Sequence, residues 1–146
     1  MTKRECLEAY GNIRSEGFTN DGPYGALGMK SLVTGGAGFI GSHVVDALIA
    51  LGHQVIVLDN FSTGRKENLE KSASRTRIVE CDLATQSDWM NEFKGVDWVF
   101  HLAGLADIVP SIQRPDDYYH SNVNGTFNVL EASKKYKVKK MVYSAS

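Results

Sequence analysis

Cysteine is scarce in this sequence, where Cys6 and Cys81 are the only two among 146 residues. Two thiols this far apart cannot form the disulfide framework that holds a small secreted domain together, and they cannot supply a tetrahedral zinc site. The four histidines add no metal site, because no two of them stand at the spacing of paired ligands. We therefore expect reduced thiols and no bound metal.

An excess of charge of one sign is also missing. The chain has 16 Lys and Arg against 17 Asp and Glu, for a net charge of −1. Because nucleic-acid binding depends on clustered Lys and Arg that neutralise phosphates, we expect no nucleic-acid partner. The one basic run, at 134–140, falls where a helix is predicted to end, and cations there interact favourably with the helix dipole.

Long hydrophobic runs do not occur either. No stretch of 18 or more apolar residues is present, and the N-terminus lacks the apolar core of a signal peptide. A membrane span and an exported precursor are therefore not expected, and we predict a cytoplasmic protein without a membrane partner.

Two regions differ in pattern. Residues 1–28 contain five glycines and Pro23 and show no sustained apolar periodicity, so we predict a flexible N-terminal extension outside the core. From residue 29 to 146, short β-branched apolar runs alternate with helical patterns, which is typical of βαβ units that feed a parallel sheet. The region 29–146 is therefore predicted to be the folded domain.

The expected elements follow from hydrophobic periodicity. Strands are predicted at 31–34, 54–58, 77–81, 96–102 and 140–144. Helices are predicted at 40–49, 88–93 and 116–136, and 62–75 reads as a polar, turn-rich segment with a short helix near Glu67. An apolar fifth strand without a further neighbour would be an exposed sheet edge.

The loop between the first strand and the first helix is rich in glycine. Gly35, Gly38 and Gly41 give the spacing G-x-x-G-x-x-G. In such a loop the early glycines allow a tight turn and close approach to a pyrophosphate, and the last lets the helix pack on the strand. Helix N–H groups then face the phosphates. A glycine-rich turn without a ligand is the alternative.

Together with the alternating elements, this loop predicts the α/β class and a Rossmann-type doubly wound parallel sheet, truncated after about five strands. Residues 29–146 are accordingly interpreted as an NAD(P)-binding domain that is incomplete at its C-terminus.

Two carboxylates follow predicted strands. Asp59 stands 18 residues after Gly41, where this fold places the ribose-binding carboxylate, and a carboxylate favours NAD because it repels the 2′-phosphate of NADP. Arg65 keeps NADP open, and a plain turn former is the alternative for Asp59. Asp82 is assigned either to an adenine amino group or to an Asx turn.

Six segments carry a resemblance to a known family. They are 34–42 (TGGAGFIGS), 59–64 (DNFSTG), 82–83 (DL), 101–104 (HLAG), 122–126 (NVNGT) and 142–146 (VYSAS). In this order they resemble the extended short-chain dehydrogenase/reductase superfamily, and within it the NAD-dependent epimerase/dehydratase family. Residues 101–126 are most similar to UDP-glucose 4-epimerases, of which the chain would be an N-terminal fragment.

The resemblance implies NAD as the cofactor and assigns residues position by position. The pyrophosphate would lie against the glycine loop with Phe39 and Ile40, and the adenosine ribose against Asp59 and Asn60. Asp82 and Leu83 would hold the adenine. Leu102, Ala103 and Gly104 would line the nicotinamide side, and Ser146 would be the catalytic serine that contacts the sugar hydroxyl.

The family's reaction also uses a Tyr base whose pKa is lowered by a Lys four residues later. The resemblance places this pair beyond Ser146, so the 146 residues are expected to be catalytically incomplete. The internal match from Tyr136 to Lys140 precedes the fifth strand and is interpreted as structural, as is Tyr143 within that strand. His101 is interpreted as a core residue, and His43, His53 and His120 as surface or helix-cap residues.

Two positions depart from residues common in 4-epimerases, namely Ala106 and Ser121, so dehydratases and decarboxylases of other nucleotide sugars stay open. The leading hypothesis is the NAD-binding part of a UDP-sugar 4-epimerase that works by transient hydride transfer, with a nucleotide sugar as substrate. A homodimer through the 116–136 helix is a further expectation. The alternative is a non-catalytic NAD-binding sensor or partner-docking module, because function follows from the site and not from the fold.

Overall fold

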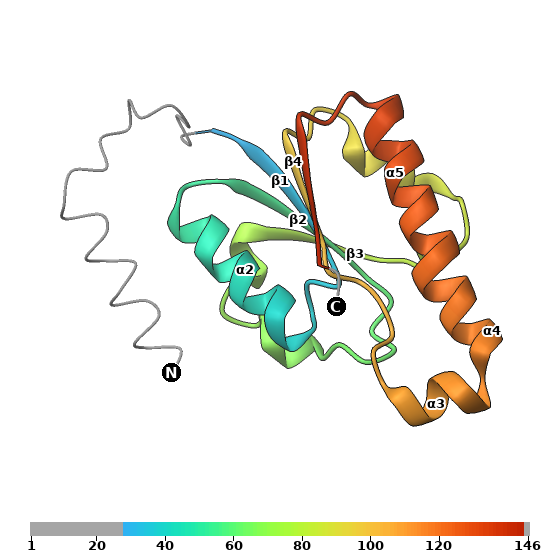
Figure 1. The fold of residues 1–146 in the computed structure, drawn as a ribbon. Coiled ribbons are helices and arrows are strands. Elements are labelled where there is room, and N and C mark those ends of the chain that lie inside the picture. The colour runs from blue at the N-terminus through green and yellow to red at the C-terminus, as the bar shows by residue number, and fades with distance from the viewer. Residues whose placement is uncertain (1–27, 145–146) are drawn as a thin grey trace.

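The computed structural model describes residues 28–144, which form a five-stranded parallel sheet with helices on both faces (Figure 1). The strands are β1 Lys30–Thr34, β2 Gln54–Asp59, β3 Thr76–Glu80, β4 Trp98–His101 and β5 Lys140–Tyr143. Their order is β3-β2-β1-β4-β5. The predicted α/β class and doubly wound parallel sheet are confirmed, whereas the predicted N-terminal extension, apart from residue 28, and the predicted site residue Ser146 lie outside the described residues.

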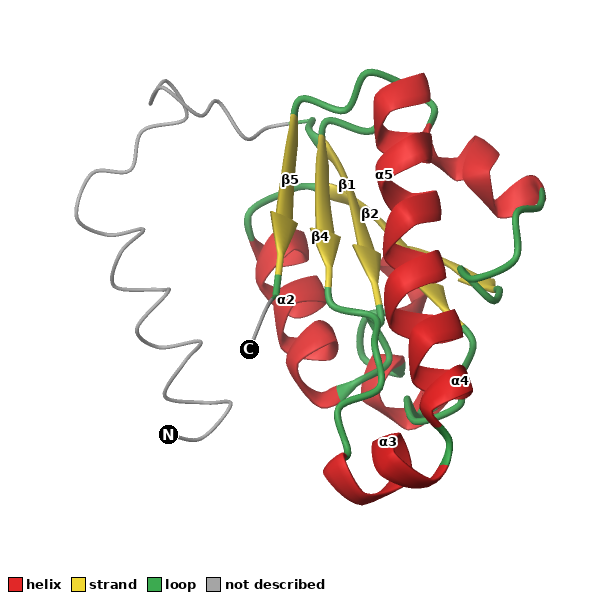
Figure 2. Cartoon of the chain, turned by 45° about the vertical axis from the view of Figure 1, so that its right-hand side comes forward, coloured by secondary structure: helices red, strands yellow, loops and turns green. Residues whose placement is uncertain are grey.

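Two helices cover opposite faces of the sheet. Figure 2 shows α2 (Phe39–Ala50) behind the strands and α5 (Gly125–Lys135) in front of them. Short 3₁₀ turns complete the connections on either side of β3: η1 (Lys66–Leu69), η2 (Ala73–Arg75) and η3 (Asp88–Phe93). No helix in the range 28–144 is long and apolar enough to cross a membrane.

The core has two layers because strand side chains alternate between the faces of the sheet. In β1, Leu32 packs in the layer under α5 and Val33 in the layer under α2, and both are fully buried. Trp89 and Phe93 of η3 extend the first layer, and Leu69 of η1 closes the second.

The prediction of one helix over 116–136 is wrong. The segment divides into α4 (Pro115–Tyr118), a π-helical segment η4 (Tyr119–Asn124) and α5. A separate helix, α3 (Ile108–Gln113), precedes it and was not predicted. Arg114 separates α3 from α4 with φ −136° and ψ 62°, outside the helical region that a following proline disfavours, and Pro115 then begins α4.

The outer strand β5 is an edge of the sheet within the described part of the chain, as predicted, because β4 is its one neighbour there. Val142 and Tyr143 are about half exposed on it. The predicted fourth strand, 96–102, is longer than the observed β4 by up to two residues at each end.

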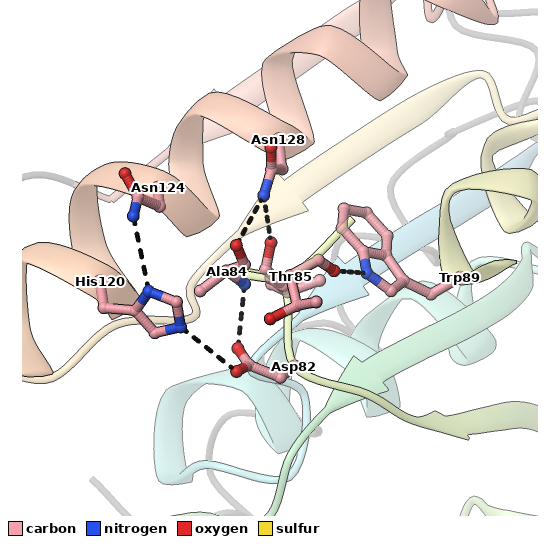
Figure 3. Close-up of polar contacts among 8 residues, drawn as sticks. Asp82, Ala84, Thr85, Trp89, His120, Asn124 and Asn128 are labelled. Atoms are coloured by element: carbon pink, nitrogen blue, oxygen red, sulfur yellow. Dashed lines mark hydrogen bonds and ion pairs between the residues drawn. The ribbon is translucent and has the colours of Figure 1, made fainter. Parts of the chain in front are cut away.

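Asn128 fastens α5 to the turn that follows β3. Its Nδ2 donates hydrogen bonds to the carbonyl oxygens of Leu83 and Ala84, at 2.9 and 3.0 Å (Figure 3). Its Oδ1 accepts one from Gln86 Nε2 at 3.0 Å. The side chain is 5% exposed. The Asn128 amide therefore provides hydrogen bonds to two carbonyl groups that lie after the end of β3 and outside the sheet.

Replacing Asn128 with leucine, which has a similar volume, removes both donors. We expect Asn128→Leu to lower the free energy of unfolding by about 1–3 kcal/mol, because carbonyl groups lose their hydrogen bonds away from water. Urea unfolding of the wild type and the variant measures the loss. Glu131→Gln, on the exposed side of the same helix, is the control and should change stability by less than about 0.5 kcal/mol; an equal effect of both substitutions would contradict this role of Asn128.

Candidate functional site

The loops that follow β1, β2, β3 and β4 enclose a cleft of about 380 Å³ at the carboxyl ends of the strands. Open α/β sheets bind their ligands at this position, where the strand order reverses. All twelve residues predicted to bind a cofactor line the cleft: Gly35, Gly38, Phe39, Ile40, Gly41, Asp59, Asn60, Asp82, Leu83, Leu102, Ala103 and Gly104. Their contacts with a ligand stay a prediction, and Ser146 lies outside the described residues.

The glycine loop brings the end of β1 close to the end of β4. Gly35 has a φ of +67°, and a Cβ on it would stand 2.7 Å from the backbone nitrogen of Ala103. A Cβ on Gly41 would collide with the carbonyl oxygen of Gly35. Gly41 therefore lets α2 approach the backbone of the loop itself, a closer contact than the predicted helix-on-strand packing.

The N-terminus of α2 faces the cleft without a cap. No side chain caps it, no acidic residue stands in its first turn, and its first internal bond runs from Ser42 N–H to Gly38 O at 3.0 Å. The N–H groups of Phe39, Ile40 and Gly41 consequently have no acceptor within the helix. This end of the helix carries partial positive charge, so it suits a phosphate group.

Asp59 is held on the wall of the cleft by backbone hydrogen bonds. Its Oδ2 accepts from the N–H of Ala37 at 2.9 Å, its Oδ1 accepts from the N–H of Phe61 at 2.8 Å, and the residue is 7% exposed. Each oxygen keeps a second lone pair for a donor such as a ribose hydroxyl. Arg65, which kept NADP open, is not among the residues that line the cleft.

Asp82 makes the Asx turn that the sequence left as an alternative. Its Oδ1 accepts from the N–H of Ala84 at 2.9 Å, and its Oδ2 lies 3.7 Å from Nε2 of His120 (Figure 3). The carboxylate is about half exposed and lines the cleft, so the turn and a role in binding are compatible.

Beneath the cleft, His101 joins three elements. Thr34 Oγ1 accepts hydrogen bonds from the N–H groups of Leu102 and Ala103, so its own proton goes to His101 Nδ1 at 2.6 Å. The imidazole proton therefore resides on Nε2, which donates to Thr126 Oγ1 at 2.9 Å. His101 is 1% exposed, and burial lowers its pKa to about 4. It is a neutral core residue, as predicted.

Two polar residues were missed or misplaced by sequence reasoning, one beside the cleft and one at the opposite, amino end of the strands. Asn122 accepts from the N–H of Leu105 at 2.8 Å and donates to its carbonyl at 2.9 Å, which fixes the loop after β4. His53, predicted to be a surface or cap residue, is buried and bonded to Ser31 Oγ at 2.8 Å, and burial lowers its pKa. Their signal in the sequence is polarity alone, which does not reveal a tertiary partner.

The internal Tyr-x-x-x-Lys match does not reach the cleft. Tyr136 donates its hydroxyl proton to Asn91 Oδ1 at 2.8 Å and is not a lining residue, which agrees with its predicted structural role. Between residues 28 and 144, no three His, Cys, Asp or Glu side chains gather where they could hold a metal.

The buried neutral state of His101 makes the fold sensitive to acid. Its folded pKa of about 4 lies below the ordinary 6.5, so the unfolded chain binds the proton first. The stabilisation is complete above about pH 6.5 and is lost as the pH falls toward 4, with a limit of roughly 3 kcal/mol. Urea unfolding at pH 7 and pH 5 measures it, and His101→Asn should show the shallower pH dependence. Equal slopes for the two proteins would contradict this assignment.

Comparisons with known proteins identify the family of the chain. The family model described as the NAD dependent epimerase/dehydratase family matches residues 31–146. The chain is 42% identical over 116 residues to a putative UDP-glucose 4-epimerase of Methanocaldococcus jannaschii, and the match covers 79% of this chain and 37% of that protein. It is 40% identical over 124 residues to the UDP-glucose 4-epimerase of Bacillus subtilis, covering 81% and 37%.

Among solved structures, the UDP-glucose 4-epimerase of Thermus thermophilus in complex with NAD gives a TM-score of 0.74 at 38% identity, covering 81% of this chain and 38% of that one. The chain spans little more than a third of the length of the curated relatives it matches. Since the family model covers most of its residues and its fold and glycine loop are those that the resemblance implied, the chain belongs to the NAD dependent epimerase/dehydratase family.

Proposed function

We propose that this chain binds NAD in the cleft at the carboxyl ends of β1–β4 and forms the cofactor-binding part of a UDP-sugar 4-epimerase. One observation carries the proposal: an uncapped helix N-terminus and a fixed carboxylate, Asp59, line the same cleft. In a dinucleotide the phosphates lie next to the ribose hydroxyls, so the phosphates can bind the helix N-terminus while the hydroxyls bind Asp59. The Thermus thermophilus relative, which is a complex with NAD, supports this choice.

In this proposal, each part of NAD binds a different group of residues that line the cleft. The N–H groups at the start of α2 bind the pyrophosphate, and Asp59 with Asn60 binds the adenosine ribose. Asp82 and Leu83 hold the adenine, while Leu102, Ala103 and Gly104 line the nicotinamide side. When bound, NAD would supply the acceptor for a hydride that the sugar gives up and then regains.

The substrate side rests on the relatives. The structure from Thermotoga maritima is a UDP-glucose 4-epimerase with UDP-glucose, 42% identical over 81% of this chain, so a UDP-sugar is the proposed substrate. Ser144 lines the cleft, and Ser146, two residues later, is proposed to bond the sugar hydroxyl. No tyrosine is among the described residues that line the cleft, so the Tyr base of the proposed reaction has no counterpart there.

A homodimer is the proposed assembly. Tyr119, Val123, Phe127 and Leu130 follow one another at helical spacing on η4 and α5, and each is about half exposed. Apolar stripes of this kind are buried when two helices pack. A second copy would present the same stripe, as a two-fold interface requires.

Asp59 allows a direct test of cofactor choice. The full chain should bind NAD more tightly than NADP, because the 2′-phosphate would meet the Asp59 carboxylate. Asp59→Asn should weaken NAD binding roughly tenfold, as expected for loss of hydrogen bonds to a charged group, and should narrow the preference over NADP. Calorimetric titration measures both constants, with Glu67→Gln on η1 as the exposed control. Equal binding of NAD and NADP by the wild type would refute this role.

Epimerisation separates the two candidate functions. The 146-residue chain should bind NAD but should not interconvert UDP-glucose and UDP-galactose, because no tyrosine is among the described residues that line the cleft. A longer product of the same gene that supplies a Tyr-x-x-x-Lys pair after β5 should do both. Turnover by the 146 residues alone would show that the expected catalytic incompleteness is wrong, and a longer product that binds NAD without turnover would favour the non-catalytic sensor or docking module.

A further inference from the structure

The π-helical segment η4 connects the two ends of the cleft. Asn122 forms two hydrogen bonds with the backbone of Leu105 in the loop after β4, and His120 faces Asp82 in the turn after β3. Ser121, between them, lines the cleft; His120 is not a lining residue itself and lies beside one, Asp82. π-helical turns are rare and occur mainly at functional sites, because the wider turn changes which side chains share a face.

Asp82 presents one free carboxylate oxygen at this end. Its Oδ1 is bound to the N–H of Ala84, and Asn128 holds the carbonyls of Leu83 and Ala84, so the turn cannot easily rotate. Figure 3 shows Oδ2 directed toward the imidazole of His120. Oδ2 therefore remains as an acceptor at the rim.

His120 presents a donor beside that acceptor. Its Nδ1 lies 3.5 Å from Asn124 Nδ2, an amide nitrogen that can only donate, so the neutral tautomer with its proton on Nε2 fits this contact. Nε2 lies 3.7 Å from Asp82 Oδ2, which is longer than a hydrogen bond. Both groups thus keep bonding capacity for a third molecule.

We propose that His120 and Asp82 together recognise the edge of the adenine base, which makes His120 a specificity-determining residue of the cofactor site. The edge of adenine presents an amino donor beside a ring-nitrogen acceptor. Asp82 Oδ2 accepts from the amino group, and the adjacent Nε2–H of His120 donates to the ring nitrogen. A base with an oxygen in place of the amino group puts an acceptor against the carboxylate and is rejected. This inference rests on the proposed binding of NAD.

The test compares two dinucleotides that differ at the edge of the base, where hypoxanthine has a 6-oxo group and a protonated N1 in place of the amino group and the acceptor N1 of adenine. NAD and nicotinamide hypoxanthine dinucleotide, which has a 6-oxo group in place of the amino group, are titrated into the full chain at pH 8, where histidine is ordinarily neutral. The wild type should prefer NAD about 5- to 100-fold, the discrimination expected of one well-placed bidentate contact to a base.

Two variants separate base recognition from a structural role. His120→Leu removes the donor and should weaken NAD binding and reduce the preference at least threefold, relative to the roughly 5- to 100-fold of the wild type. His120→Gln keeps a side-chain N–H donor and should retain most of the preference. Because the His120 side chain is 54% exposed, both variants should unfold at the temperature of the wild type. Glu131→Gln is the matched control on α5.

Three outcomes would contradict different parts of the proposal. An unchanged preference in His120→Leu, or an equal loss in both His120 variants, overturns the role of His120 and leaves NAD binding intact. A wild type that binds both dinucleotides equally overturns recognition of the base by this pair. A wild type that binds neither dinucleotide, while folded, refutes the proposed function itself.

Discussion

The hydroxyl of Thr34 is the contact on which the rest of the site depends. It stands at the end of β1, accepts the N–H groups of Leu102 and Ala103 at 3.2 and 3.3 Å, and donates to His101. One oxygen thereby joins β1 and β4, the two neighbouring strands at which the strand order reverses. The next residue, Gly35, can then pass so close to Ala103 that a side chain would not fit. The cleft exists because these two strand ends are held together.

His101 suits this position because a neutral imidazole both accepts and donates. Its Nδ1 receives the Thr34 proton and its Nε2 gives a proton to Thr126, so a fully buried ring leaves no polar atom unpaired. Its face stacks on Tyr143 of β5, with ring centroids 5.5 Å apart. The hydrogen-bonded line from β1 through β4 to the start of α5 is therefore continuous, and a charge on the ring would disrupt it.

How far the sequence predicts this structure depends on the range of the interaction. The strands and the glycine loop follow from local patterns, and Asp59 follows from its place after a strand, so these were predicted. The division of 116–136 into α4, η4 and α5 was not, because Tyr119, Val123 and Phe127 are spaced four apart and fit an α-helix and a wider turn equally well. Asn122, Asn128 and His53 were missed or misplaced because their partners are distant in the chain, and polarity alone does not name a partner.

The contacts of η4 explain how a cleft made of separate loops can act as one site. Asn122 fixes the loop after β4, Asn128 in the next turns fixes the turn after β3, and both side chains project from one continuous helical segment. The spacing between the two walls is then set by that segment, since β3 and β4 are not neighbours in the sheet. A dinucleotide that spans both walls meets a distance fixed before it binds, so little conformational freedom is lost on binding. The side-chain amides of Asn122 and Asn128 thus hold the loops after β4 and β3 in place, just as the Thr34 hydroxyl holds the ends of β1 and β4 together.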